Sequence, residues 1–227
     1  MGDLASHRRH RVIALELPRG DAGVRLLCLG AHADDIEIGC GGTVLRWLQE
    51  GRVASVTWVV LSGAGVRADE ARASAAAFLA GASRVDVQVA DFPDTRFPSH
   101  VDAIKERFEA IARAGAYDVV LTHARHDRHQ DHRVVSDLTW NTWRDHLVLE
   151  YEVMKVDGDL LPPNLYVPLD DETRHKKVDL LLRHFPSQAT KAWFDAEAFN
   201  GLMRLRGLEA NAPERHAEAF HAHKLVL

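Results

Sequence analysis

Residues 24–43 read VRLLCLGAHADDIEIGCGGT. The stretch opens with an apolar run whose length and composition are typical of a strand that is buried on both faces. The run leads directly into His32, Asp34 and Asp35, whose side chains are costly to bury without partners. A cluster of glycines follows, and then a helical pattern begins. The stretch therefore predicts a buried strand whose carboxyl end carries a polar site.

Outward from this stretch, strand-like segments alternate with helix-like segments. The strand-like segments are residues 24–30, 53–63, 84–92 and 117–123. The helix-like segments that follow them are residues 43–51, 69–81, 100–115 and 131–146. This alternation predicts an α/β fold of Rossmann-like class, with a doubly wound, mostly parallel sheet, helices on both faces and right-handed crossovers.

The pattern changes in the C-terminal third. The strand-like segments there are residues 147–154 and 165–169, and the helical ones are residues 171–184 and 195–209. No linker, low-complexity tract or internal repeat divides the chain. We therefore expect one domain over residues 1–227, in which residues 1–10 form a flexible N-terminal extension and the C-terminal third caps the sheet and shapes a pocket.

Composition excludes several classes of function. The chain has 227 residues and a formal net charge of -5, which gives no general electrostatic reason to bind nucleic acid or an anionic membrane. No segment approaches the ~20 apolar residues of a membrane span, so we expect no stable membrane anchor. Cys28 and Cys40 lie in or beside apolar segments, which favours buried free thiols and a reducing, cytoplasmic location.

A second polar cluster follows another buried strand. Residues 122–135 read THARHDRHQDHRVV and contain four histidines and two aspartates. Ligands of doubly wound sheets bind at the carboxyl ends of the strands, where both clusters are expected to lie. A catalytic zinc takes three nitrogen or oxygen ligands and leaves one position open. His32, one of the two adjacent aspartates and one histidine of the second cluster complete that set, and the other aspartate remains as a base.

Other interpretations of these residues are less favoured. The HADD segment alone is consistent with helix capping, because Asp is common at helix N-termini. The GCGG segment resembles a phosphate-binding loop, but it lacks the G-x-G-x-x-G spacing, and the acids beside it would repel a phosphate. The histidine run is also consistent with a solvated surface segment, which suits His126 best. Two such clusters, each after a buried strand, favour a metal site.

These motifs resemble those of the PIG-L/LmbE family of zinc-dependent N-deacetylases. AHADDIEIGCGG is similar to the family's A-H-P-D-D-E motif with its glycine-rich continuation, and HQDH at residues 129–132 matches H-x-D-H. Weaker similarities are RADE at 67–70, HFPSQ at 184–188 and HAEAF at 216–220. Ala33 replaces the usual proline, and Ile36 stands where glutamate is common, with Glu37 one position later.

The resemblance implies an LmbE-like fold and a role for each matching residue. His32, Asp35 and His132 would bind Zn²⁺, although Fe²⁺ or Co²⁺ suits the same ligands. Asp34 would be the general base.

His129 would act as an acid or an electrostatic stabiliser. Asp131 would be hydrogen-bonded to His129 and tune its proton, or would instead cap the following helix. Arg67 would bind a substrate hydroxyl or phosphate, unless it is simply an exposed arginine at a helix start.

The resemblance also implies a reaction, the removal of the N-acetyl group from an N-acetylglucosamine-type amino sugar with release of acetate. The partner would be a small-molecule amino sugar, and a homo-oligomer is compatible with the sequence. One alternative is a zinc amidase for a larger N-acyl or thiol-conjugate substrate. A second is a carbohydrate-binding domain that has lost catalysis, although neither the ligands nor the base are missing. A third, a nucleotide-binding module, would bind nucleotide and no zinc.

Overall fold

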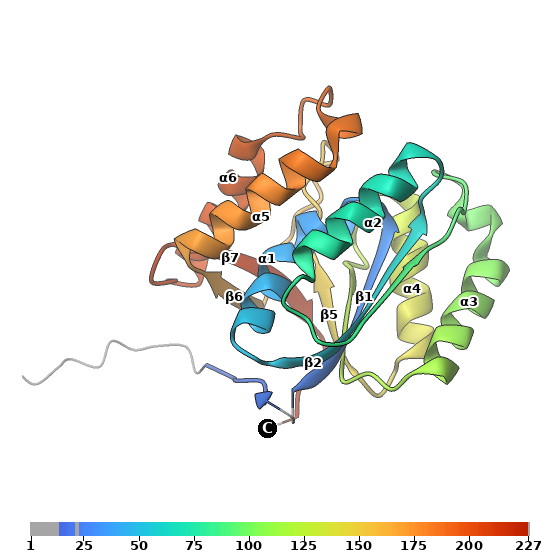
Figure 1. Ribbon diagram of the computed structural model, residues 1–227, viewed down its shortest axis with the longest axis horizontal. Helices are drawn as coiled ribbons and strands as arrows, with labels where there is room; N and C mark the ends of the chain where they lie inside the picture. The colour runs from blue at the N-terminus through green and yellow to red at the C-terminus, as the bar shows by residue number, and fades with distance from the viewer. Residues whose placement is uncertain (1–13, 21–22, 227) are drawn as a thin grey trace, which may run out of the picture.

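A seven-stranded sheet forms the centre of the protein, in the order β3-β2-β1-β4-β5-β7-β6 (Figure 1). The structure is a computed structural model that describes residues 14–20 and 23–226, so the extension expected at residues 1–10 lies outside the described residues. The strands are β1 Val24–His32, β2 Val53–Ser62, β3 Val85–Val89, β4 Val119–His123, β5 Leu147–Tyr151, β6 Leu165–Leu169 and β7 His216–Ala222. The helices are α1 Asp35–Gln49, α2 Val66–Phe78, α3 Val101–Ala114, α4 Gln130–Thr142, α5 Asp171–His184 and α6 Ala196–Glu209. The predicted α/β class is confirmed.

The first five strands are parallel, and β7 runs antiparallel to both β5 and β6. The strand order reverses between β1 and β4, which are adjacent in the sheet but separated along the chain by two other strands, β2 and β3. Such a reversal leaves a crevice at the carboxyl ends of the two strands. Both polar clusters of the sequence follow these two strands.

Each face of the sheet has its own hydrophobic core, which explains the unbroken apolar run in β1. Leu26 and Cys28 pack on one face with apolar residues of α1, α2, α5 and α6. Leu27 and Leu29 pack on the other face with residues of α3 and α4 (Figure 1). Because successive side chains of a strand point to opposite faces, a strand covered on both sides has no polar alternation.

Helix α1 begins at Asp35, whereas the sequence pattern predicted a helix only from Thr43. The prediction was wrong because glycine has a low helix propensity, yet the glycines here lie inside the helix. A Cβ atom on Gly39 would lie 2.2 Å from Cδ2 of Tyr151, and one on Gly42 would lie 2.6 Å from Cδ1 of Leu169. The glycines therefore let α1 pack closely against the sheet.

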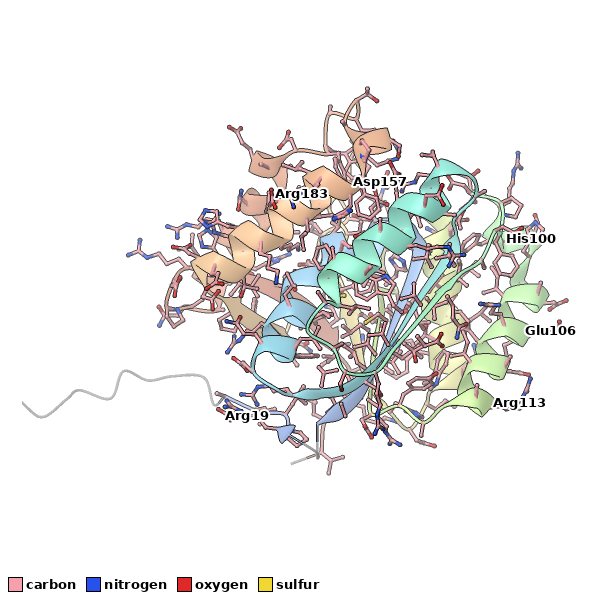
Figure 2. The ribbon with its side chains drawn as sticks, viewed as in Figure 1. Arg19, His100, Glu106, Arg113, Asp157 and Arg183 are labelled. Carbon is pink, nitrogen blue, oxygen red and sulfur yellow. The ribbon has the colours of Figure 1, made fainter. Side chains whose placement is uncertain are left out.

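Charged side chains cover the outer surface of the helical layers. Figure 2 shows Glu106 and Arg113 on α3 and Arg183 on α5 pointing away from the sheet. Asp157 lies at the end of the molecule where the parallel strands terminate. Within residues 14–20 and 23–226, no helix is both long and apolar enough to cross a membrane.

Helix α6 provides a test of how closely the C-terminal third is packed. A Cβ atom on Gly207 would lie 2.2 Å from the carbonyl carbon and oxygen of Arg215, which precedes β7. Because backbone cannot move aside cheaply, we expect Gly207→Ala to lower the free energy of unfolding by about 1–3 kcal/mol. Urea denaturation of the purified protein measures the change.

Gly201 of the same helix is the matched control, because no described atom lies within 4 Å of an added Cβ there. Gly201→Ala should leave stability unchanged or raise it by up to about 1 kcal/mol through helix propensity. Equal effects of the two substitutions would contradict the packing of α6 against the segment before β7.

Candidate metal centre

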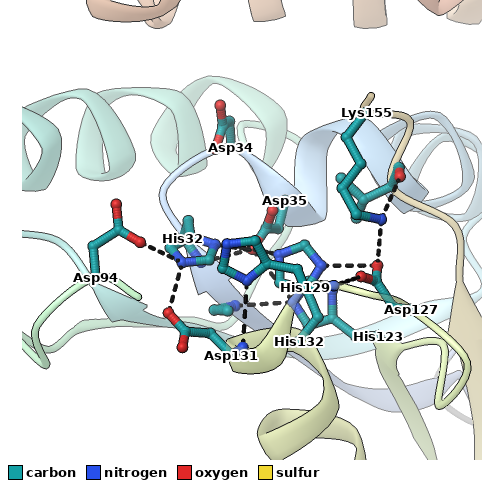
Figure 3. A network of polar contacts seen from close by, with 12 residues as sticks. His32, Asp34, Asp35, Asp94, His123, Asp127, His129, Asp131, His132 and Lys155 are labelled. Atoms are coloured by element: carbon teal, nitrogen blue, oxygen red, sulfur yellow. Dashed lines mark hydrogen bonds and ion pairs between the residues drawn. The ribbon is translucent and has the colours of Figure 1, made fainter. Parts of the chain in front are cut away.

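The two polar clusters meet at the carboxyl ends of β1 and β4. His32 is the last residue of β1, Asp34 and Asp35 start α1, and His132 lies in the first turn of α4. Figure 3 shows that side chains from both segments converge on the same place. Neighbouring parallel strands end at the same edge of the sheet, so the fold unites residues 100 positions apart.

Three ligand atoms form a nearly equilateral triangle. Nδ1 of His32 lies 3.2 Å from Oδ2 of Asp35 and 3.2 Å from Nε2 of His132, and the last two atoms are 3.4 Å apart. Ligands at ~2.0–2.1 Å from a tetrahedral zinc lie about 3.3 Å from one another. The imidazole and carboxylate donors and their spacing therefore suit one divalent ion with an open fourth position.

The charges at the triangle also suit a cation. Burial by itself would raise the pKa of Asp35, but His132, His123 and His32 hold that pKa well below its usual range. Burial would likewise lower the pKa of His32, but Asp35, Asp131 and Asp94 raise it well above the usual value. Positive charge is therefore favoured next to the Asp35 carboxylate, and a divalent ion provides it without protons on the rings.

His123 also lies beside Asp35 but is less suitable as a ligand. It is fully buried, and its ring stacks on that of His132 with centroids 3.9 Å apart. The backbone N–H of Ala31 donates to Nε2 of His123 at 3.0 Å, so the nitrogen that lies 3.3 Å from Oδ2 of Asp35 already uses its lone pair. His32, whose Nδ1 faces both other ligand atoms, completes the triangle better.

Carboxylates orient both ligand rings from behind. Asp127 Oδ2 lies 2.8 Å from Nδ1 of His132, while Asp131 and Asp94 lie 3.2 Å and 3.0 Å from Nε2 of His32. Such partners hold the proton on the outer nitrogen and leave the inner one free for a metal.

Asp131 occupies a different position from the one that the sequence predicted. Its carboxylate accepts hydrogen bonds from the backbone N–H groups of Thr95 at 2.7 Å and Phe97 at 3.1 Å, in addition to its contact with His32. It does not bond the His129 ring; only the backbone N–H of Asp131 donates to Nδ1 of His129, at 3.3 Å. Nor does it cap α4, because the His129 side chain is the cap. The carboxylate therefore contacts a predicted metal ligand, and it acts on His129 through its charge, which opposes the lowering of that ring's pKa.

Asp34 has one engaged and one free oxygen. It stands at the N-cap position of α1, but its side chain makes no capping hydrogen bond, so the capping interpretation is wrong. Arg67 donates to Oδ1 at 2.9 Å, whereas Oδ2 is buried and has no partner among the described residues. Burial and the charge of Asp35 raise the pKa of Asp34, and Arg67 opposes the rise.

Arg67 is held by protein groups on several sides. Besides Asp34 it bonds Glu70 at 3.2 Å and Oγ of Ser187 at 3.3 Å. Ser187, from the HFPSQ segment, also donates its backbone N–H and its hydroxyl to Glu70 at 2.9 Å and 2.6 Å. The arginine predicted to bind substrate thus fixes the carboxylate of Asp34, and the weak C-terminal motif supports it.

His129 lies close to both ligand rings, and ring nitrogens of His32, His129 and His132 also lie near enough to one another to hold one ion. Its ring centroid is 4.8 Å from that of His32 and 4.6 Å from that of His132. Burial and the positive charges of these two rings lower the pKa of His129. Since Nδ1 accepts the capping hydrogen bond, Nε2 remains available for a ligand or a proton.

The sequence reasoning missed some partners of the site, and it favoured a position outside the site for His126. Asp94 comes from the loop before α3, and its only sequence signal is its place after a strand. His126 belongs to the histidine run, but its ring packs against His221. Glu37 accepts a hydrogen bond from Ser74 at 2.6 Å, so the displaced acid of the first motif does not orient His32.

The sequence profile of the family described as PIG-L, GlcNAc-PI de-N-acetylase, matches residues 27–143, which is more than half of the chain. The chain belongs to the PIG-L family. The matched region contains both polar clusters and every predicted site residue. Most of β1, strands β2–β4 and the candidate metal centre therefore lie within the region of this PIG-L protein that matches its family.

Solved structures with the same fold carry different activities. The conserved protein TT1542 from Thermus thermophilus is 21% identical over 90% of this chain and 96% of its own, with a TM-score of 0.69. N,N'-diacetylchitobiose deacetylase from Pyrococcus horikoshii is 17% identical over 88% and 83%, with a TM-score of 0.65. GalB, a 4-carboxy-2-hydroxymuconate hydratase from Pseudomonas putida, is 16% identical over 90% and 98%, with a TM-score of 0.68. At these identities the likeness shows the fold, which hosts more than one reaction.

The geometry of the triangle predicts one tight divalent metal ion per chain. We expect Zn²⁺ to raise the melting temperature of metal-free protein, because free metal at 100 times Kd stabilises by about 2.7 kcal/mol. Asp35→Asn and His132→Ala should abolish the shift, and differential scanning fluorimetry with increasing zinc measures it. His126→Asn is the matched control and should keep the full shift, since His126 lies against His221. An equal loss in all three variants would contradict the assignment.

Proposed function

We propose that this PIG-L protein is a metal-dependent N-deacetylase that removes the acetyl group from an N-acetylglucosamine-type amino sugar. One observation carries the proposal: among the described residues, Asp34 presents a buried, unpartnered carboxylate oxygen beside a three-ligand triangle that suits a divalent ion. A proton acceptor next to a metal with an open position is what amide hydrolysis requires. The family description and the activity of the Pyrococcus relative support an N-acetylated amino sugar as substrate.

A divalent ion held by His32, Asp35 and His132 would polarise the acetamide carbonyl and acidify the attacking water. Zn²⁺ suits this ligand set, and Fe²⁺ or Co²⁺ fits the same donors. In the proposed reaction, Oδ2 of Asp34 accepts the proton of the water that attacks the carbonyl carbon. Arg67 donates to the other oxygen, Oδ1, and so restrains the carboxylate.

His129 provides the second proton function in this proposal. Its ring lies beside both ligand rings, and in this proposal Nε2 donates to the carbonyl oxygen as negative charge develops there. The same proton then passes to the nitrogen of the departing amine, which leaves as the free amino sugar while acetate is released. This transfer uses the doubly protonated ring, whose Nδ1 no longer accepts the hydrogen bond from Asp131, and the lowered pKa of His129 makes that ring a stronger acid.

The acyl group and the sugar are open to direct test. A larger N-acyl or thiol-conjugate substrate would use the same residues, because acyl size is set by the walls of a pocket. Since a hydratase shares the fold, the assay must measure acetate and free amine separately. We expect the activity in the cytoplasm, where Cys28 and Cys40 would remain the buried free thiols that the structure shows.

The decisive experiment is acetate release from a panel of N-acetylhexosamine compounds by zinc-loaded protein, with bulkier N-acyl glucosaminides alongside. We expect Asp34→Asn to retain zinc and to lose about 10²–10⁴-fold in kcat, the usual contribution of a general base. His126→Asn should behave like the wild type. Zinc-loaded protein that releases neither acetate nor amine from the panel would refute the proposal.

The position of Arg67 predicts a shift in the pH profile. The base must be ionised, and Arg67 lowers the pKa of Asp34, so removing the arginine raises that pKa. Arg67→Met should therefore move the acidic limb of kcat/KM to higher pH by about one unit, the lower end of the effect of a neighbouring opposite charge. Arg67→Lys should recover part of the shift. A raised KM with an unmoved limb would indicate instead the substrate contact that the sequence predicted.

A further inference from the structure

A buried lysine stands directly behind the candidate metal centre. Lys155 lies on the loop between β5 and β6, and its side chain is only 10% exposed. Its Nζ lies 2.9 Å from Oδ2 of Asp127 and 2.7 Å from Oδ2 of Asp159 (Figure 3). Burial alone would lower the pKa of Lys155, but Asp159 and Asp127 raise it. The ammonium group is therefore charged, and both of its carboxylate partners are nearly buried.

Asp127 links this ammonium group to a predicted metal ligand. Its Oδ1 accepts a hydrogen bond from the backbone N–H of His129 at 2.7 Å. Its Oδ2 is shared by Lys155 Nζ and by Nδ1 of His132, at 2.9 Å and 2.8 Å. With the proton on Nδ1, Nε2 of His132 is left bare and faces the Asp35 carboxylate at 3.4 Å. The rotamer of Asp127 thus decides which nitrogen of His132 faces the ion.

Asp159, the other partner of Lys155, connects the loop after β5 to the loop before α4. Oδ2 of Asp159 accepts a hydrogen bond from the backbone N–H of Arg128 at 2.7 Å, next to Asp127 in the chain. Lys155 and Asp159 therefore hold the segment around Asp127 from two sides, through a side chain and through the backbone. An exposed surface pair could not do this, because it would have freedom to move.

We propose that Lys155 is a positioning residue for the metal centre, which through Asp127 holds the His132 ring with Nε2 directed at the ion. The inference rests on the proposed metal-dependent function and extends it to a loop outside both sequence motifs. Lys155 contacts neither the ion nor the substrate. It acts on the orientation of the His132 ring before the metal binds.

The direction in which zinc affinity changes when Lys155 is removed distinguishes a positioning role from two simpler roles. A lysine that acted only through its charge would repel the metal, so its removal would strengthen zinc binding. A lysine that only stabilised the loop would, on removal, lower the melting temperature and leave zinc affinity unchanged. A positioning lysine is the case in which removal weakens zinc binding.

The test measures zinc affinity of metal-free protein by competition with a chromophoric chelator. Lys155→Met should weaken zinc binding by about tenfold, the lower end of the range for groups behind metal ligands. Lys155→Arg should recover most of the affinity. Lys105→Met is the matched control, because Lys105 forms a more exposed pair with Glu109 at 3.4 Å within α3. It should bind zinc like the wild type.

A second measurement reports on the ring itself. Burial would lower the pKa of His132, but Asp35 and Asp127 raise it, so the spectra are recorded at a pH high enough for this ring to be neutral. Nitrogen-15 NMR of the histidine rings in metal-free protein should then show His132 in the wild type with its proton on Nδ1. In Lys155→Met we expect this single form to be lost, and in Lys155→Arg we expect it to return. If Lys155→Met does not fold, Asp159→Asn provides the same two measurements, because it removes the group that holds Lys155 in place.

Unchanged or tighter zinc binding by Lys155→Met, with His132 still protonated on Nδ1, overturns the inference. If the wild type binds zinc and releases acetate in that case, the proposed function stands and only the role of Lys155 fails. If the wild type binds no zinc, the proposed function and the inference fail together.

Discussion

The carboxylate of Asp35 is buried among imidazole rings, and the arrangement of the site follows from its need for positive charge. Burying a lone carboxylate costs several kcal/mol, so the fold must place cationic or hydrogen-bonding groups around it. His32 at the end of β1 and His132 in the helix after β4 meet this need, because the reversal of strand order makes β1 and β4 neighbours. A divalent ion would compensate the negative charge of Asp35 more completely than the imidazole rings do. Metal binding and the stability of the site therefore depend on the same buried charge.

The groups that orient the two ligand rings come from three further loops. Asp94 belongs to the loop before α3, Asp127 to the loop before α4, and Lys155 to the loop after β5. All three loops start at the carboxyl ends of parallel strands. The ligands and the groups that orient them therefore lie at the same edge of the sheet. The glycines of α1 contribute by allowing the helix that starts at Asp35 to pack against Tyr151.

The sequence predicted the parallel core and which residues would meet, because both depend on local patterns. Buried strands appear as apolar runs, and polar groups at their ends converge in any doubly wound sheet. It did not predict where α1 begins, since packing overrides the low helix propensity of its glycines. It missed β7, whose alanine-rich residues give a weak strand signal.

Partners within the site were harder to predict than its members. The placement of Asp131 against His32, and of Arg67 against Asp34, depends on rotamers and on backbone N–H groups from a distant loop. No spacing rule contains that information. Lys155 lies outside both motifs, and only the folded chain brings it to Asp127. The sequence motifs therefore identify the candidate ligands, whereas only the folded structure shows which side chains orient those ligands.

The most direct measurement of the central claim is the position of the ion in crystals of zinc-loaded protein, located by anomalous scattering at the zinc edge. We predict a single tightly held ion at ~2.0–2.2 Å from Nδ1 of His32, a carboxylate oxygen of Asp35 and Nε2 of His132. An ion held instead by His123, or one lying between His32, Asp94 and Asp131 with the Asp35 carboxylate unbound, would contradict it.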